Sequence, residues 1–411
     1  MTSISSALFQ LPGQCIQSIT LDNEQTVVIQ CRRDKRRKPI DPRTNQSGTI
    51  NRYVHRRVRD LPISGHPCVI DIELAQVSTQ NYERRIEHCE FVGNGARYTT
   101  RFCNMISGLC RYMSIHAVSK HLNIRWETVK NIDRAYLLSS LPSLDPKSIT
   151  GLTHIGVDEV ARAKGHDYMT VVYDLVQGHL IWVEQGRQSH VLQSFFTQLP
   201  KATAAGIKAV AMDMGQAYQS AVRRSLPHAD IVFDRFHVMR NYHVLIKNQR
   251  RKEFFKSTNE GRQIMKGTLY LLLKNAYKLD EKQSGRLDDL LESNKSLCTI
   301  YMMKEQLQAL WQETSYEAMD NALEGWCRLA ESTNILALHN FATGLRIHKV
   351  GICNYAKYKL TSARIEAGNV SIGMIRRRAR GVRDTEYFKL KIRQTSVPAT
   401  HSIFYPKINL T

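Results

Sequence analysis

The sequence lacks several features that would place it in other protein classes. No run approaches the roughly 18 apolar residues of a membrane-spanning helix, and residues 1–11 lack the basic start and long apolar stretch of a secretory signal. The nine cysteines are odd in number and form no C-x-x-C pair, which favours free thiols in a reducing compartment. We therefore expect a cytoplasmic protein without a membrane partner.

Acidic residues are also scarce relative to basic ones. The 411 residues include 58 Lys and Arg but only 37 Asp and Glu, a formal net charge of +21. Hydrophobic residues make up 42% of the chain, an ordinary value for a folding protein of several domains. The excess charge therefore indicates a polyanionic partner, with nucleic acid as the leading candidate.

Most of this charge lies in two segments. Residues 32–59 contain eleven Lys or Arg and two Asp, a net charge of +9, and residues 346–393 contain thirteen Lys or Arg and three acids, a net charge of +10. This clustering favours two phosphate-binding surfaces. The alternative is a pair of basic faces that only keep the protein in solution.

The N-terminal region, residues 1–100, has the pattern of a small β-rich module. Residues 26–30 and 68–77 alternate apolar and polar side chains, which predicts strands, while the charged segment 32–48 with its two prolines predicts a loop. A Gly93-Asn94-Gly95 turn ends the module. Within the basic segment, Arg56 and Arg57 are candidate DNA contacts.

Residues 105–145 predict a helix-turn-helix. The apolar positions between Ser114 and Ile132 suit two short helices around a tight turn at Asn123, with Ile124 between them. The second helix would present a set of side chains to a DNA groove: Arg125, Trp126, Thr128, Lys130 and Asn131. A helical hairpin that serves only for packing has a similar pattern. Pro142 and Pro146 then mark a linker.

The central region predicts a multidomain α/β protein with a mixed five-stranded sheet. Its elements follow the order β-β-β-α-β-α-β, which is the ribonuclease H-like order. The expected strands are 155–158, 168–175, 180–184, 207–213 and 230–234, and the expected helices are 190–199 and 217–226. This core spans residues 150–245 and resumes at 341–395. A proline-free helical insertion, 246–340, separates the two parts, and residues 396–411 form a tail.

Two aspartates are placed to share a metal site. Asp158 and Asp213 close the first and fourth strands, which we expect to be parallel neighbours with their carboxyl ends at one sheet edge. Paired carboxylates at that edge could bind two Mg²⁺ or Mn²⁺ ions. Alternatively, a single strand-terminal Asp often serves only as a turn former or helix cap.

A third acid would come from a helix expected at residues 362–380. Glu366 lies in its first turn, followed by a basic track of Arg376, Arg377 and Arg380, as DNA cleavage would require. Read locally, Glu366 is equally a first-turn acid that complements the helix dipole.

Three blocks of sequence resemble the transposases of the ISL3 insertion-sequence family. They are IGVDEVARAKGHDYMTVVYDL, AVAMDMGQAYQSAVRRSLPHADIVFDRFHVMRNY and IEAGNVSIGMIRRRARGVRDTEYFKLKI. The resemblance implies a DDE transposase domain of ribonuclease H-like fold, in which Asp158, Asp213 and Glu366 match the catalytic acids and bind two Mg²⁺ or Mn²⁺ ions.

Two smaller signatures agree with this resemblance. Asp234 and His237 match a D-x-x-H element, and Glu366 with Asn369 matches the family's E-x-x-N. The alternative for His237 is a hydrogen-bonded polar residue at the sheet edge that takes no direct part in the chemistry. In the helical insertion we interpret Trp311 and Trp326 as core residues, with stacking on a DNA base as the alternative.

The N-terminal cysteines depart from the family pattern. The family usually carries a zinc ribbon with two C-x-x-C-like pairs, but here Cys31 and Cys89 have no partner at that spacing. The candidate replacements Asp34, His55 and His88 do not restore a tetrahedral zinc spacing. We expect a metal-free module with both cysteines as buried thiols.

The resemblance implies a complete DNA-processing activity. The protein would bind the terminal inverted repeats through its N-terminal half, cleave the DNA ends by metal-dependent hydrolysis and join the 3′-hydroxyl to target DNA. Its partners would be double-stranded DNA and further copies of the chain, as a homodimer or larger synaptic oligomer at the bacterial nucleoid. The alternatives are a sequence-specific DNA-binding regulator and a ribonuclease H-like structure-specific nuclease.

Overall fold

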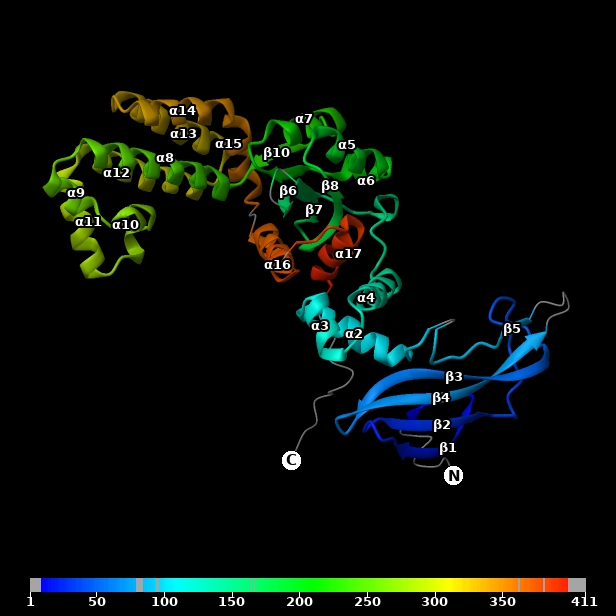
Figure 1. Ribbon diagram of the computed structural model, residues 1–411. Coiled ribbons are helices and arrows are strands. Elements are labelled where there is room, and N and C mark those ends of the chain that lie inside the picture. The colour runs from blue at the N-terminus through cyan, green and yellow to red at the C-terminus, as the bar shows by residue number, and fades with distance from the viewer. Residues whose placement is uncertain are drawn as a thin grey trace, which may run out of the picture. The chain divides into compact units, whose positions relative to one another are not determined.

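The computed structural model describes residues 9–78, 84–93, 96–163, 165, 167–360, 363–379 and 381–397. The chain divides into two compact units, Met1–Leu141 and Pro142–Thr411 (Figure 1). Arg380, two residues of the predicted turn at 93–95 and nearly all of the predicted tail lie outside the described residues. Of the helices in the described ranges, none has both the length and the apolar character needed to cross a membrane.

The first unit begins with a five-stranded sheet in the order β1-β2-β4-β3, with β5 added to β4. Strands β2 and β4 pair in parallel and the other pairs are antiparallel. Alternation along β4 buries Cys68, Ile70, Ile72 and Leu74 against one core, so the predicted strands at 26–30 and 68–77 are confirmed. The strands are β1 (Gln14–Leu21), β2 (Val27–Arg33), β3 (Thr49–Ile63), β4 (His66–Ser78) and β5 (Arg84–Ile86).

Three helices complete the first unit: α2 (Thr100–Tyr112), α3 (Ile115–Leu122) and α4 (Trp126–Ser140). Asn123 adopts a left-handed conformation with φ 50°, which asparagine tolerates better than most residues, and it ends α3. Ile124 is buried between the helices together with Val118 and Val129. The two short helices and the turn at Asn123 are therefore confirmed, whereas α2 was not predicted as a separate helix.

The second unit contains a mixed sheet in the order β10-β9-β6-β7-β8. The predicted sequence of strands and crossover helices is correct, apart from one additional short helix, α6. The strands are β6 (His154–Ala163), β7 (Asp167–Asp174), β8 (His179–Gln185), β9 (Ala209–Met212) and β10 (Asp230–Phe233). The helices between them are η1 (Pro146–Ser148, before β6), α5 (Ser189–Gln198), α6 (Lys201–Gly206) and α7 (Gln216–Ser225).

The prediction that Asp158 ends its strand is wrong. Strand β6 continues to Ala163 because its antiparallel ladder with β7 runs on past Asp158, which faces Val171. The parallel ladder with β9, in contrast, stops at Gly156. Asp158 thus lies two residues beyond the last pair with β9 but in the middle of strand β6.

Helices cover both faces of this sheet (Figure 1). Helices α5 and α7 bury Phe195 and Val222 with β6, β9 and β10 on one face. Helices α16 (Ala363–Ala379) and α17 (Thr385–Thr395) bury Ile365, Ile372 and Phe388 against β7 and β8 on the other. Helix α15 (Lys349–Tyr358) covers the edge strand β10, where the Asn354 Nδ2 donates to the Ile231 carbonyl at 2.9 Å.

A group of helices separates the two halves of the second unit, as predicted. Helix α8 already begins at Arg235, so it runs across the predicted boundary at residue 245. Trp311 and Trp326 are both buried, and the Trp326 indole donates to the Met303 carbonyl at 2.9 Å, which confirms them as core residues. The helices are α8 (Arg235–Lys256), α9 (Asn259–Met265), α10 (Leu269–Leu273), η2 (Ala276–Lys278), α11 (Glu281–Ser293), α12 (Lys295–Ala309), η3 (Leu310–Gln312), α13 (Tyr316–Ser332) and α14 (Leu336–Ile347).

Candidate active site

Three aspartates share one level across three neighbouring strands of the second unit. The β6–β9 ladder pairs His154 with Ala209, an offset of 55 residues that also relates Asp158 to Asp213. The β9–β10 ladder pairs Phe233 with Met212, so Asp234 follows at the level of Asp213. Since all three strands are parallel, the three aspartates follow their strands at the carboxyl edge of the sheet, where open α/β sheets bind ligands. The carboxylates of Asp158 and Asp213 are close enough there for their charges to interact.

Asp158 is the most constrained of these acids. The Nδ2 of Asn369 donates to its Oδ2 at 2.6 Å, and the backbone N–H of Glu159 donates to its Oδ1 at 2.7 Å. Burial raises the pKa of the Asp158 carboxyl, and the negative charge of Asp213 adds to this. The Glu159 amide, the nearby His237 and the Asn369 amide act in the opposite direction. Asp158 therefore sits in a half-buried site close to a second carboxylate.

Asp213 lies directly after β9 and is fixed by the turn into α7. Its Oδ1 accepts a hydrogen bond from the Gly215 N–H at 2.9 Å. A Cβ at position 215 would stand 2.8 Å from that oxygen, closer than real Cβ contacts allow. A side chain at position 215 would therefore displace the Asp213 carboxylate from the Gly215 N–H.

Asp234 and His237 stand beside this pair. Asp234 is buried and its Oδ1 accepts from the Phe236 N–H at 3.2 Å, as the N-cap of α8. Its Oδ2 lies 3.7 Å from His237 Nδ1, and within the described residues neither atom has a hydrogen-bond partner. His237 is thus held close to both Asp234 and Asp158 without being tied to either.

Glu366 lies in the first turn of α16, half-buried. Asn369 follows three residues later, on the same side of the helix, and reaches Asp158. The register of α16 on the sheet depends on two glycines: a Cβ at Gly156 would collide with Ile365, and a Cβ at Gly368 would collide with the hydroxyl of Tyr173. Close packing of helix on sheet therefore sets which turn of α16 faces the aspartates.

The two aspartates are suited to binding a divalent cation, whose positive charge would offset the repulsion between their carboxylates. The two half-buried carboxylates repel each other, and hard oxygen ligands are those that Mg²⁺ and Mn²⁺ prefer. Across the described residues, however, no group of three or more His, Cys, Asp or Glu side chains is arranged to hold a metal ion. The structure thus brings Asp158 and Asp213 together and leaves Glu366 on the adjoining helix turn outside a three-ligand cluster.

A fourth acid at this edge was missed in the sequence. Glu159 follows Asp158 on β6, and its carboxylate lies 3.8 Å from the Arg187 guanidinium, which itself stacks over Tyr168 at 4.5 Å. Burial raises the pKa of Glu159, Arg187 opposes this, and the charges of Asp213 and Asp158 add to it. Glu159 directly follows Asp158 in the sequence, but Arg187 lies 28 residues further along, and no local pattern connects the two.

Comparison with known proteins identifies the family of the chain. Residues 155–392 match a family model described as a transposase of the ISL3 family with a DDE domain, and residues 87–137 match the helix-turn-helix domain of transposase family ISL3. The chain belongs to the ISL3 family of transposases. It is 35% identical to the transposase of insertion sequence IS1001 from Bordetella parapertussis over 85% of this chain and 87% of that protein. It is 25% identical to the IS1557 transposase of Mycobacterium tuberculosis over 80% and 79% of the two chains.

In the helix-turn-helix of this transposase, some of the side chains predicted to contact a DNA groove are exposed. Arg125, at the N-cap of α4, is exposed, and 51% of Trp126 is accessible to solvent. Thr128 and Lys130 are half-buried. The N-terminal turn of the second helix, which enters the major groove in proteins of this type, therefore carries exposed basic and aromatic side chains.

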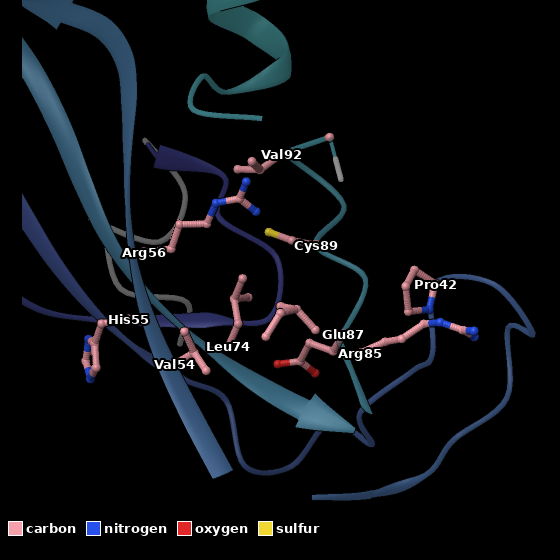
Figure 2. A pocket seen from close by; sticks show the side chains of 11 residues that line it. Pro42, Val54, His55, Arg56, Leu74, Arg85, Glu87, Cys89 and Val92 are labelled. Carbon is pink, nitrogen blue, oxygen red and sulfur yellow. The ribbon is translucent and has the colours of Figure 1, made fainter. Parts of the chain in front are cut away.

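The arginines predicted to contact DNA elsewhere have divergent environments. On α16, the Arg376 Nη1 donates to the Ala161 carbonyl at 2.8 Å, while Arg377 is exposed. On β3, Arg57 is exposed and faces Asp71 of β4, whereas Arg56 lines a cavity of about 590 Å³ on the core side of the sheet (Figure 2). Arg377 and Arg57 are thus exposed to solvent, whereas Arg376 fixes α16 on β6.

The same cavity contains Cys89, one of the two cysteines left from the family's zinc ribbon pattern (Figure 2). Burial raises the pKa of Cys89 to about 11 and that of Cys31 to about 12, which opposes the thiolate state that zinc requires. The negative charge of Asp71 adds to the effect of burial at Cys31, and among the described residues no group of three or more His, Cys, Asp or Glu side chains could hold a metal ion. These residues do not fit a zinc site.

A buried ion pair holds this region together instead. The Arg33 Nε donates to both carboxylate oxygens of Glu87 at 2.8 and 3.0 Å, and the side chains are only 3% and 8% exposed. Glu87 also accepts the Ala75 N–H at 2.7 Å, and the Arg33 Nη2 donates to the Arg37 carbonyl at 2.7 Å. The pair thereby links β2, β4 and the segment before Cys89.

Proposed function

We propose that this transposase binds the terminal inverted repeats of an insertion sequence, cleaves the DNA ends by metal-dependent hydrolysis and joins the freed 3′-hydroxyl to target DNA. The catalytic core would be a ribonuclease H-like domain with Asp158, Asp213 and Glu366 as its acids. The observation that carries the proposal is the proximity of the Asp158 and Asp213 carboxylates, with Asn369 hydrogen-bonded to Asp158.

The acids of the chain would hold the cations of the reaction. Asp158 and Asp213 supply oxygen ligands from two adjacent strands, and Glu366 supplies a third from α16. When bound, the divalent ions lower the pKa of the attacking hydroxyl and neutralise the leaving oxygen. Asn369 fixes the orientation of the Asp158 carboxylate, a role that outer-shell residues commonly have at metal sites.

His237 is suited to a supporting role at this site. Its imidazole lies near Asp158 and Asp234, and its Nδ1 has no hydrogen-bond partner among the described residues. A group in this position can orient the nucleophile or hold a proton near the scissile phosphate. The basic residues of α16, including exposed Arg377, would bind adjacent phosphates.

End recognition would come from the N-terminal half. Arg125 and Trp126 stand at the exposed start of α4, where they would contact base edges, while Thr128 and Lys130 would contact the adjoining backbone. Arg57 on β3 would add a backbone contact. This division separates sequence recognition in the first unit from chemistry in the second.

A cleavage and strand-transfer assay with Mg²⁺ and oligonucleotides that contain the element's ends tests the proposal. Each of the isosteric variants Asp158→Asn, Asp213→Asn and Glu366→Gln should bind the ends as wild type does but lose cleavage. Glu386→Gln, an exposed glutamate of α17, is the matched control and should cut normally. Cleavage retained in any of the three variants would remove that acid from the site.

The joining step separates this function from its rivals. A DNA-binding regulator would bind the same ends without cutting them, and a structure-specific nuclease would cut branched DNA without joining it. Transfer of a labelled end into a target duplex by the wild-type protein, lost in Asp158→Asn, is the expected result.

A further inference from the structure

A groove in the second unit lies between α7 and the junction of α14 with α15. Two adjoining hollows of about 450 and 220 Å³ share Gln219, Arg223, Ile347 and His348, so they form one continuous groove. Neither hollow includes Asp158, Asp213 or Glu366 in its lining. The groove is therefore separate from the proposed metal site.

The groove nevertheless begins at the same sheet edge. Helix α7 starts at Gln216, three residues after Asp213, and Gln216, Gln219 and Arg223 follow one face of the helix. Arg223 stands about 10 Å along the helix axis from Gln216, at a rise of about 1.5 Å per residue. One wall of the groove thus leads directly away from the aspartates.

The opposite wall is anchored to the neighbouring strand. The His348 ring meets the Phe233 ring edge-on at 5.2 Å, and a Cβ at Gly351 would stand 2.5 Å from that same ring. Phe233 is the last residue of β10 and immediately precedes Asp234. Both walls are consequently fixed relative to the carboxyl edge of the sheet.

The groove is positively charged. Arg223 and Arg224 are exposed, and in the described part of the chain neither forms an ion pair; the Arg223 Nη2 lies 3.5 Å from the Gln219 Oε1. Asp230, the acid that lines the groove, is already paired with Lys357 at 2.8 Å. Burial, with the charge of Arg223 beside it, lowers the pKa of His348, so the two arginines supply the charge near neutral pH.

The rim of the groove is apolar. Ile347 is 74% exposed and Val350 is 64% exposed, unusual values for aliphatic side chains. Two uncompensated arginines next to exposed aliphatic side chains match the surface of a DNA strand, which offers phosphates and apolar sugar and base faces. An acidic protein surface would match the arginines but not the connection to the catalytic edge.

We propose that this groove holds the DNA strand that flanks the cleavage point, with its phosphates on Arg223 and Arg224 and its sugars against Ile347 and Val350. The inference rests on the proposed function, because it takes the scissile phosphate to lie at Asp158 and Asp213. In this proposal, α7 binds the flanking DNA strand and does not bind the DNA of the element's own end.

The test compares binding of uncut ends, which carry flanking DNA of increasing length, with binding of pre-cut ends that carry none. Affinities are measured by fluorescence anisotropy without divalent metal and across a salt series. The variant is R223A/R224A, and the control is R251A/K252A, which removes two consecutive exposed basic residues from α8. Equal thermal melting of the three proteins establishes that both variants are folded.

Wild type and control should gain affinity as the flank lengthens, and R223A/R224A should lose this gain while it binds pre-cut ends normally. Loss of two phosphate contacts lowers the slope of log K against log salt on uncut ends by about 2, and R223K/R224K should restore it. An unchanged flank gain in R223A/R224A, an equal loss on pre-cut ends, or a change of oligomeric state without a change in flank binding would each overturn the inference. Because binding is measured apart from cleavage, wild-type protein that shows the flank gain yet never cuts would contradict only the proposed function.

Discussion

The side-chain amide of Asn369 donates a 2.6 Å hydrogen bond to the Oδ2 of Asp158, a residue 211 positions away in the chain. This contact joins α16 to the central strand β6. It aligns the helix turn that carries Glu366 with the two strands that carry Asp158 and Asp213. The hydrogen bond thus connects the two parts of the second unit that the group of helices from α8 to α14 separates.

Removing this amide should slow the chemistry without weakening the fold. Asn369→Ala leaves Asp158 with one hydrogen bond fewer, and we expect about a 10- to 100-fold loss in single-turnover cleavage, the usual effect of losing an outer-shell partner. If the substitution only lets the Asp158 carboxylate take several orientations, a higher Mg²⁺ concentration should restore part of the cleavage rate. Val370→Ala, an exposed neighbour on α16, is the control. A normal rate with a normal Mg²⁺ dependence in Asn369→Ala would contradict the positioning role.

Gly368 should tolerate no side chain because α16 lies against Tyr173 at that point. Gly368→Ala forces the helix away from the Tyr173 hydroxyl, and overpacking of this kind costs about 1–3 kcal/mol of unfolding free energy. Gly373→Ala on the same helix meets only one distant arginine atom, so it should be neutral or stabilising. Urea unfolding measures both changes.

The Tyr173 hydroxyl itself offers a second measurement of this contact. It is buried and has no hydrogen-bond partner among the described residues. Tyr173→Phe removes the nearest obstacle to a Cβ at position 368, so the double variant with Gly368→Ala should recover part of the lost stability and cleavage. If the stability losses of the two single variants simply add in the double variant, the Tyr173 hydroxyl is not the group that a Cβ at position 368 displaces.

The stability of the first unit should depend on the Arg33–Glu87 pair and not on a metal. Glu87→Gln leaves a buried guanidinium without its counter-charge, which costs about 3–5 kcal/mol. Glu90→Gln breaks the exposed pair with Arg37 and should cost at most about 1 kcal/mol. Thermal melting of the full chain should be unchanged by a zinc chelator, and a chelator-induced drop in melting temperature would disprove the metal-free account.

The exposed start of α4 should determine which DNA sequence is bound. Trp126→Ala and Arg125→Ala should each weaken binding to the element's ends by about 1–3 kcal/mol, the scale of one base-edge contact. Binding to unrelated DNA should change much less. Leu138→Ala, equally exposed at the other end of the same helix, is the control. Gel shifts with end-containing and scrambled duplexes at one salt concentration distinguish these outcomes.

Much of the second unit was predictable because its signals are local. Turns between β6, β7 and β8 and the helical periodicity of α5 and α7 define the strand order, and right-handed crossovers then make β9 a parallel neighbour of β6. From that order alone, Asp158 and Asp213 had to meet at one edge. The extension of β6 to Ala163 was missed because it depends on pairing with β7, which does not show in the strand's own sequence.

The roles of single polar side chains were less predictable. Arg376 reads as part of a basic track, yet it donates to the Ala161 carbonyl. Glu159 reads as a neighbour of Asp158, yet alternation along the strand turns it toward Arg187. Such pairings depend on which residues the folded chain brings within hydrogen-bonding or ion-pair distance of each other. No local sequence pattern indicates which distant residues these are.

The amino-acid sequence by itself determined the charge distribution, the order of the elements in the second unit and the helix-turn-helix with its turn at Asn123. These follow from composition, periodicity and local turn chemistry, which act over a few residues. Only the tertiary structure decided that Asn369 clamps Asp158, that glycines at 156 and 368 let α16 reach the sheet, and that Arg223 and Arg224 line a groove leading from the aspartates. Those relationships depend on close packing between distant segments, where a single methyl group or the length of one side chain decides whether two residues meet.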